Sequence, residues 1–122
     1  MNMDNAESEH IINVSTQKNF TFFVYLAKKF LESNDVVELH ALGSAIISAV
    51  QAADTLIKHE YTTLDKIFTN SIMLDRQDGG KIKKAKLYIH LKKAPTFDDA
   101  VAKFEKEREE RFKQQEEFGA HE

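Results

Sequence analysis

The sequence predicts an α+β domain: a mixed four-stranded sheet with helices on one side, followed by a C-terminal helix. Four segments have the β-branched composition or the alternation of strands: 11–15, 36–40, 64–75 and 81–93. Two segments between the first three strands repeat apolar residues at helical spacing: 20–31 and about 44–59. The order is therefore β-α-β-α-β-β. Because β-α-β crossovers take one hand, both helices are expected on the same side of the sheet.

The first two strands are short, and each leads into a helix. Residues 11–15 (IINVS) are β-branched and apolar, and residues 36–40 (VVELH) place Glu38 and His40 at alternate positions. The helix at 20–31 is amphipathic, and its apolar face carries Phe23, Leu26, Ala27, Phe30 and Leu31. Turn residues at 33–35 end this helix.

Small residues and turn residues define the rest of the domain. Ser44 follows Gly43 and is a plausible N-cap for the second helix, whose alanines would let another element approach closely. The string Gln77-Asp78-Gly79-Gly80 is a hairpin signal between the last two strands. Pro95 ends the last strand, and Thr96 is the expected cap of a charged helix over residues 96–117. We expect only the first half of that helix to dock on the domain.

The charge of the chain is unevenly distributed. Residues 1–10 carry three acidic residues and no Lys or Arg, residues 11–95 carry twelve Lys or Arg and eight acidic residues, and residues 96–122 carry five and nine. We therefore expect an acidic, disordered N-terminus, a basic domain at 11–95 and a charged helical tail at 96–122. A basic middle with acidic ends permits binding to a polyanion through the middle only.

Composition excludes several functional classes. With no cysteine in 122 residues, disulfides, thiolate metal sites and thiol nucleophiles are excluded. No apolar run is long enough to span a membrane, and the acidic start is not a secretory signal, so we expect a cytoplasmic or nuclear protein. The five histidines lack metal-ligand spacing, and no nucleophile or acid-base pair is visible. We expect no catalytic residues, no metal and no cofactor.

The main functional signal is the basic hairpin. Its candidate binding residues are Arg76, Lys81, Lys83, Lys84 and Lys86, with Lys92 and Lys93 further along the strand. Both arms look longer than the earlier strands, so the tip is expected to project and to contact phosphates. The alternative is a charged, solvated hairpin that resists edge-to-edge aggregation.

A second candidate lies where the first strand turns into the first helix. Lys18 and Asn19 offer a cation and an amide near a helix N-terminus, a place where phosphate binds. The alternative is an ordinary Asn N-cap beside a surface lysine, and local sequence favours this simpler interpretation.

Several strings resemble the Alba family of small nucleic-acid-binding proteins over about residues 12–93. The matching strings are Asn13-Val14, Lys18, ALGSAI (41–46) and the QDG turn (77–79). The aromatic FFVYLAKKF (22–30) and the last strand KIKKAKLYIHL (81–91) are similar to the eukaryotic branch, including small plant members. The resemblance implies an Alba-like fold, shared with the C-terminal domain of a bacterial translation initiation factor.

The resemblance also implies roles for individual residues. The central lysine of the family falls on Lys18, the second lysine of the archaeal pair on Asn19, and the hairpin arginine on Lys83. Leu42 and Ser44 stand where archaeal members have arginines, which favours RNA, or RNA and DNA together, over the coating of duplex DNA. Family dimers use the second helix and the last two strands, which here implies Ile47, Val50, Leu56 and Phe68.

The leading hypothesis is a non-enzymatic homodimer that binds RNA, and DNA as a further ligand, mainly through phosphates. The alternative is a structural subunit of a ribonucleoprotein such as ribonuclease P or MRP, working as a heterodimer with another Alba-like chain. No membrane partner is expected. Chromatin packaging, mRNA storage and translational control are all compatible with the sequence.

Overall fold

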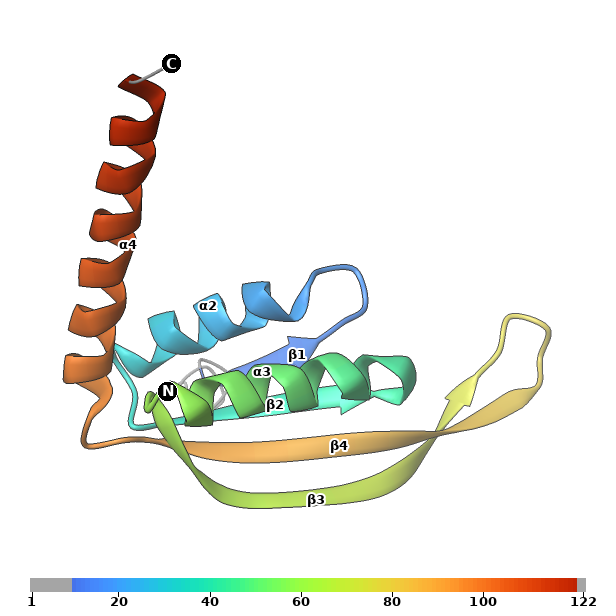
Figure 1. Ribbon diagram of the computed structural model, residues 1–122. Helices are drawn as coiled ribbons and strands as arrows, with labels where there is room; N and C mark the ends of the chain where they lie inside the picture. Colours follow the sequence, from blue (N-terminus) through green and yellow to red (C-terminus); the bar gives the residue numbers. More distant parts are fainter. Residues whose placement is uncertain (1–9, 121–122) are drawn as a thin grey trace.

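The computed structural model describes residues 10–120, with side chains through residue 116 (Figure 1). One sheet has the strand order β1-β2-β4-β3, and its strands are β1 (Ile11–Val14), β2 (Val36–Leu42), β3 (Thr62–Asp75) and β4 (Lys81–Lys93). β1 and β2 are parallel, and the other two pairings are antiparallel. The predicted mixed sheet is therefore confirmed.

Two helices cover one face of this sheet, and a third follows it (Figure 1). The helical elements are α2 (Phe20–Leu31), the 3₁₀ turn η1 (Gly43–Ala45), α3 (Ile46–Lys58) and α4 (Phe97–Ala120). α2 and α3 connect the first three strands, as predicted. α4 leaves the end of the sheet opposite the β3–β4 hairpin tip (Figure 1).

The core lies between the sheet and the two helices. Alternate residues of the central strands are buried: Val37, Leu39 and Ala41 in β2, and Leu87, Ile89 and Leu91 in β4. α2 contributes Phe23, Ala27 and Leu31, and α3 contributes Ala49, Ala52, Ala53 and Leu56. The alanines of α3 bring its backbone close to α2 and the sheet, as the sequence predicts.

The start of the second helix differs from the prediction. Ser44 lies inside η1, and Ala45 precedes α3 without any side-chain cap. Gly43 has a positive φ of 56°, so the chain turns there and completes a 3₁₀ turn before the α-helix begins. A serine inside that turn is not in the position of an N-cap.

α3 ends in a Schellman motif. The Tyr61 N–H donates to the Leu56 carbonyl at 3.0 Å, and the Glu60 N–H donates to the Ile57 carbonyl at 3.0 Å. Glu60 has a φ of 66°, in the left-handed region that glycine normally occupies at this position. The Glu60 carbonyl also accepts a hydrogen bond from the Thr96 hydroxyl at 2.9 Å, so Thr96 connects the loop after α3 to the loop before α4, while its own carbonyl accepts the Ala100 N–H at 2.9 Å at the start of α4.

Among the α4 side chains described, those through residue 116, only the ones in the first turns pack on the domain. Phe97 and Ala100 are buried, whereas Phe112 is exposed. The Lys28 ammonium lies 3.9 Å from the Phe104 ring centroid and 4.6 Å from that of Tyr61. Burial lowers the pKa of Lys28, and Glu105 opposes that shift. Within residues 10–120, no helix is both long and apolar enough to cross a membrane.

The predicted disordered segment 1–10 lies outside the described residues except for His10. The carbonyl of His10 accepts a hydrogen bond from the Glu38 N–H at 2.7 Å, so this residue is already attached to the sheet. His10 therefore belongs with the domain and not with the acidic N-terminal segment.

Candidate nucleic-acid interface

The β3–β4 hairpin extends past the rest of the sheet. β3 pairs with β4 from Lys81 to Lys93, whereas β2 pairs with β4 only from Lys86 to Lys92. The segments 71–75 and 81–85 therefore pair only with each other, and none of their side chains is buried. They form a two-stranded ribbon that projects from the sheet (Figure 1), as predicted.

The turn at the tip has the geometry that its sequence predicts. The Arg76 N–H donates to the Gly80 carbonyl at 2.7 Å, and the Gly79 N–H donates to the Arg76 carbonyl at 3.1 Å. Gly79 has a φ of 89°, and the Asp78 carboxylate accepts the Gly80 N–H at 3.0 Å. Asp78 also lies 3.7 Å from the Arg76 guanidinium, which reduces the charge at the tip itself.

The hairpin lysines keep their charge unneutralised. Lys81, Lys83 and Lys84 are exposed and Lys86 is half-buried, and within the described side chains none of the four forms an ion pair. Lys84 and Lys86 lie on the face away from the helices, while Lys81 and Lys83 lie on the other face. Cations on both faces suit a ribbon that contacts phosphates from more than one side.

Other candidate residues lie at the same end of the sheet. The β1–α2 loop that carries Lys18 and the turn η1 both lie at the end from which the hairpin projects (Figure 1). Lys18 is exposed, and its ammonium lies 5.0 Å from the Phe22 ring centroid. The Lys84 side chain passes close to Gly43, because a Cβ added there would lie 3.5 Å from Lys84 Cδ.

Asn19 serves α2 as its N-cap. Its side-chain oxygen accepts the Thr21 N–H at 3.0 Å and the Thr21 hydroxyl at 3.1 Å. This is the simpler of the two interpretations that the sequence left open, and it commits the amide oxygen to the helix. Only the amide NH₂ remains to face a ligand, so Lys18 is the stronger candidate of the pair.

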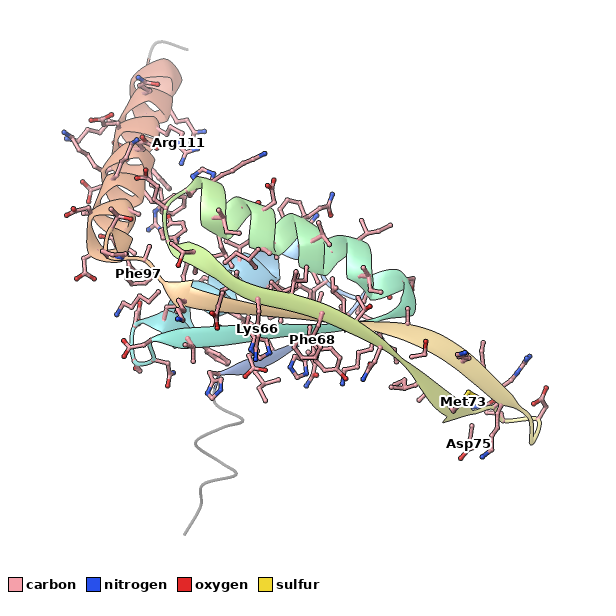
Figure 2. All side chains as sticks on the ribbon, turned by 90° about the horizontal axis from the view of Figure 1, so that it is seen from below. Lys66, Phe68, Met73, Asp75, Phe97 and Arg111 are labelled. Carbon is pink, nitrogen blue, oxygen red and sulfur yellow. The ribbon has the colours of Figure 1, made fainter. Side chains whose placement is uncertain are left out.

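Sequence reasoning missed an aromatic row on the sheet face away from the helices, the open face. Phe68, Tyr88 and His40 are cross-strand neighbours on β3, β4 and β2. The Phe68 and Tyr88 rings stack with centroids 4.6 Å apart at 8°, and His40 meets Tyr88 edge-on at 4.8 Å. Figure 2 views this face, with Phe68 and Lys66 labelled on β3. The signal was the alternation of β4, which placed Tyr88 and His90 opposite the core.

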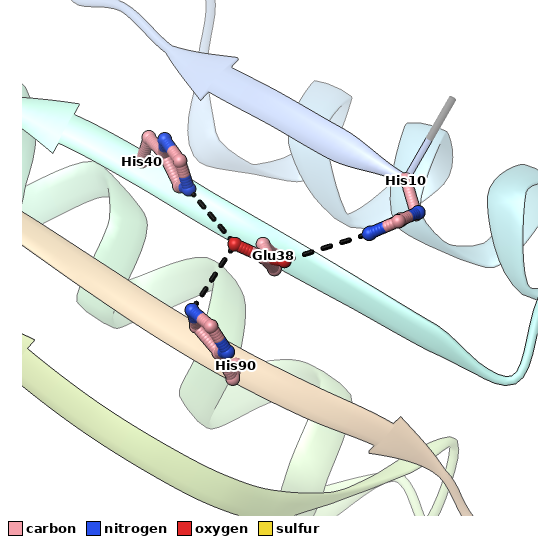
Figure 3. Close-up of polar contacts among 4 residues, drawn as sticks. All are labelled: His10, Glu38, His40 and His90. Carbon is pink, nitrogen blue, oxygen red and sulfur yellow. Dashed lines mark hydrogen bonds and ion pairs between the residues drawn. The ribbon is translucent and has the colours of Figure 1, made fainter. Parts of the chain in front are cut away.

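Beside the aromatic row, three histidines surround one carboxylate (Figure 3). His40 Nε2 and His90 Nε2 each lie 3.1 Å from Glu38 Oε1, and His10 Nε2 lies 3.5 Å from Glu38 Oε2. Among the described residues, no group of three or more His, Cys, Asp or Glu side chains is arranged to hold a metal ion. The spacing of these histidines in sequence gave no sign of the cluster, because β2, β4 and the residue just before β1 bring them together.

The expected dimer residues fall in three different environments. Ile47 and Val50 are exposed on α3, whereas Leu56 on the same helix is 0% exposed and supports the core from inside. Phe68 lies on the open face, away from α3, because it pairs with Tyr88 and not with a core residue. Leu56 and Phe68 therefore do not share a surface with Ile47 and Val50. On the helix side of β3, Leu64 and Ile67 are exposed as well.

A model of the Alba family matches residues 10–67. An uncharacterized protein of Arabidopsis thaliana is 32% identical over 108 residues, which cover 88% of this chain and 83% of that protein. The crystal structure of ALBA1 from Trypanosoma brucei is similar with a TM-score of 0.70 and 25% identity, over 89% of this chain and 90% of that one.

An archaeal structure shows the same fold. Alba from Thermoplasma volcanium matches with a TM-score of 0.59 and 21% identity, over 68% of this chain and 99% of its own. The chain belongs to the Alba family, whose members are generally nucleic-acid-binding proteins.

Proposed function

We propose that this protein is a homodimer that binds RNA, and DNA as a further ligand, through phosphate contacts from the β3–β4 hairpin and Lys18. The observation that carries the proposal is the projecting ribbon, whose lysines are not neutralised by carboxylates of the described chain. Such ammonium groups can replace the counterions around a phosphate backbone, and the release of those ions favours binding.

The proposed dimer explains an apolar surface that the protomer leaves uncovered. Ile47 and Val50 on α3 and Leu64 and Ile67 on β3 expose large side chains, and α3 contacts β3. Exposed apolar side chains on neighbouring elements are typical of an interface with another protein. A second copy placed here would put two hairpins and two Lys18 side chains into one assembly, so more lysines could contact the same nucleic acid.

The size of the purified protein separates this proposal from its alternative. A stable homodimer supports the leading function. A monomer or aggregate that becomes soluble and defined only with a second Alba-like chain supports a heterodimeric ribonucleoprotein subunit instead. The same apolar surface would serve either partner, so sizing the full chain alone is decisive.

Binding titrations test the ligand and the surface together. The full chain would be titrated with single-stranded RNA, duplex RNA and duplex DNA at several salt concentrations. We expect Lys83→Glu/Lys84→Glu to weaken binding to all three ligands, because it reverses two charges on the ribbon. The matched control is Lys103→Glu/Lys106→Glu on α4, at the other end of the sheet, which should have little effect. Equal binding by the hairpin variant and the native protein would remove the hairpin from the function.

A further inference from the structure

We propose that the open face of the sheet binds single-stranded nucleic acid by stacking bases on the aromatic row of His40, Tyr88 and Phe68. Lys66 and Lys86 would take the adjoining phosphates. This inference rests on the proposed function. It adds to the phosphate-binding hairpin a second surface, which distinguishes single strands from duplexes. The two surfaces share β3 and β4 but use different residues.

The aromatic row is accessible and has a flat ring at its outer end. Phe68 is 44% exposed although it is a large apolar side chain, and no helix covers this face (Figure 2). Its ring is nearly parallel to Tyr88, so the two form a stack that a base can extend. Four-stranded sheets with aromatic side chains on the open face are a recurrent way to bind single-stranded RNA, since every base has a π-face.

Positive charge lies at both ends of the stack. The Lys66 ammonium lies 5.9 Å from the Phe68 ring centroid, and the Lys86 ammonium lies 4.9 Å from the Tyr88 centroid. An incoming base would replace an ammonium at the ring, and the displaced lysine could then reach a neighbouring phosphate. Two carboxylates adjoin this face in the part of the chain that the structure describes: Glu38, which histidines surround, and Asp65, which lies 3.6 Å from the Lys92 ammonium.

Neighbouring groups hold the site in shape. Glu38 fixes the His40 and His90 rings, and His90 in turn lies 5.4 Å from Phe68. Next to the row, a shallow hollow of about 240 Å³ is lined by Asn13, Val14, His40, Ala41, Leu42, Ile72 and Lys86. The Asn13 amide and the Lys86 ammonium can donate hydrogen bonds at the wall of this hollow, and the Asn13 oxygen can accept one. A preformed site of this kind loses little entropy when a base enters it.

The chemistry of the face selects among possible occupants. A protein partner would bury the exposed apolar ring of Phe68, which is favourable. It would also bury the ammonium groups of Lys66 and Lys86 without supplying phosphates to pair with them. A duplex has its bases already paired and stacked, so it cannot extend the Phe68–Tyr88 stack. A single strand supplies both free bases and phosphates, and it is therefore the occupant that complements both features.

The test compares one ring on the open face with one ring elsewhere. The full chain would bind a single-stranded RNA containing 2-aminopurine and a duplex RNA of the same length. We expect Phe68→Leu to weaken single-strand binding about tenfold, since stacking one base is worth roughly that factor, and to leave duplex binding unchanged. Stacking on the native protein should quench the 2-aminopurine fluorescence. The same RNA bound to the Phe68→Leu variant should fluoresce more brightly. The matched control is Tyr25→Leu, a ring 55% exposed on α2 beside Lys29, which should change neither affinity.

The outcomes distinguish this inference from the proposed function. If Phe68→Leu binds the single strand as the native protein does, or loses both ligands in equal proportion, the inference is wrong while hairpin binding stands. If the native protein binds neither ligand, both proposals fail. Phe68→Trp retains a stacking ring and should keep single-strand affinity, so it serves as the folded reference if the leucine variant is unstable. Loss of single-strand affinity in a folded Phe68→Trp variant would also contradict the inference.

Discussion

The two halves of the β3–β4 ladder have the same alternation of side chains between the two faces, but they differ in how far those side chains are buried. In the half beneath α2 and α3, Leu87, Ile89 and Leu91 are buried at successive alternate positions. In the projecting half, the same face of β4 continues with Ala85, Lys83 and Lys81, and all three are exposed. Strand alternation therefore decides which face a side chain occupies, whereas a covering layer decides whether that face becomes core. Where the layer ends, the strand can carry charge on both faces.

The largest expected difference between the two halves is in stability. Ile89→Ala removes a side chain that is 2% exposed and should lower the free energy of unfolding by about 2–5 kcal/mol, because it leaves a cavity. Ile82→Ala makes the same change at a side chain that is 38% exposed on the projecting half, and should cost less than about 1 kcal/mol. Urea unfolding of both variants measures the difference. Equal losses would mean that the projecting half contributes to the core after all.

The second expected effect is on self-association, and it concerns the exposed apolar residues of α3. Ile47→Asp, at a side chain 69% exposed on α3, should weaken self-association at least tenfold, because it would bury an unpaired charge in the dimer. The protomer should keep its stability, since Ile47 is not part of the core. Sedimentation equilibrium measures the change, with Tyr25→Asp on α2 as the matched control. An unchanged association constant would place the dimer interface elsewhere.

The covered end of the sheet should also respond to high pH where the exposed end does not. Burial raises the pKa of Tyr61 above 10.0, and Glu107 adds to the shift. Because the phenol stays protonated longer in the folded than in the unfolded protein, its contribution to stability is complete below pH 10 and is lost as the pH rises through the folded value. Tyr61→Phe should remove this part of the pH dependence. Urea midpoints at pH 9 and pH 10.5 measure it, and an identical decline in both proteins would contradict the assignment.

The smallest expected effect lies at the loop that joins α3 to β3. Glu60 adopts a left-handed backbone with φ of 66°, which is unfavourable for a residue with a Cβ. Glu60→Gly should therefore raise the free energy of unfolding by about 0.5–1 kcal/mol while leaving nucleic-acid affinity unchanged. Urea unfolding checks the gain. A loss of stability would show that the Glu60 side chain makes a contribution greater than the backbone strain that it introduces.

Local patterns predicted most of the fold because each element depends on near neighbours. Alternation identified both faces of β4, helical spacing identified α2, and the QDGG string identified the hairpin turn. Positions that depend on distant contacts were not accessible in the same way. The Thr96 hydroxyl donates to a carbonyl 36 residues away, a contact that no local pattern around Thr96 could predict. Ser44 was misplaced because the 3₁₀ turn depends on how Gly43 leaves β2.

In the candidate site too, features set by neighbouring residues were predictable and features set by distant contacts were not. The basic hairpin was visible in the sequence because its lysines are contiguous on one strand. The aromatic row and the histidines around Glu38 were not, because they come from three strands whose register is fixed by the assembled sheet. Phe68 was assigned to the dimer surface by family resemblance. Its pairing with Tyr88 places it on the open face, opposite the helices, and its role in a dimer stays a prediction.

The salt dependence of RNA binding tests the central role of the projecting ribbon most directly. The logarithm of the binding constant would be plotted against the logarithm of salt concentration for the native protein, for Lys83→Gln/Lys84→Gln and for Lys103→Gln/Lys106→Gln on α4. We predict that the hairpin variant has a shallower slope, by about 0.7–0.9 for each phosphate that it no longer neutralises, and that the α4 variant matches the native protein. A hairpin variant whose slope and affinity equal those of the native protein would contradict the proposed mechanism.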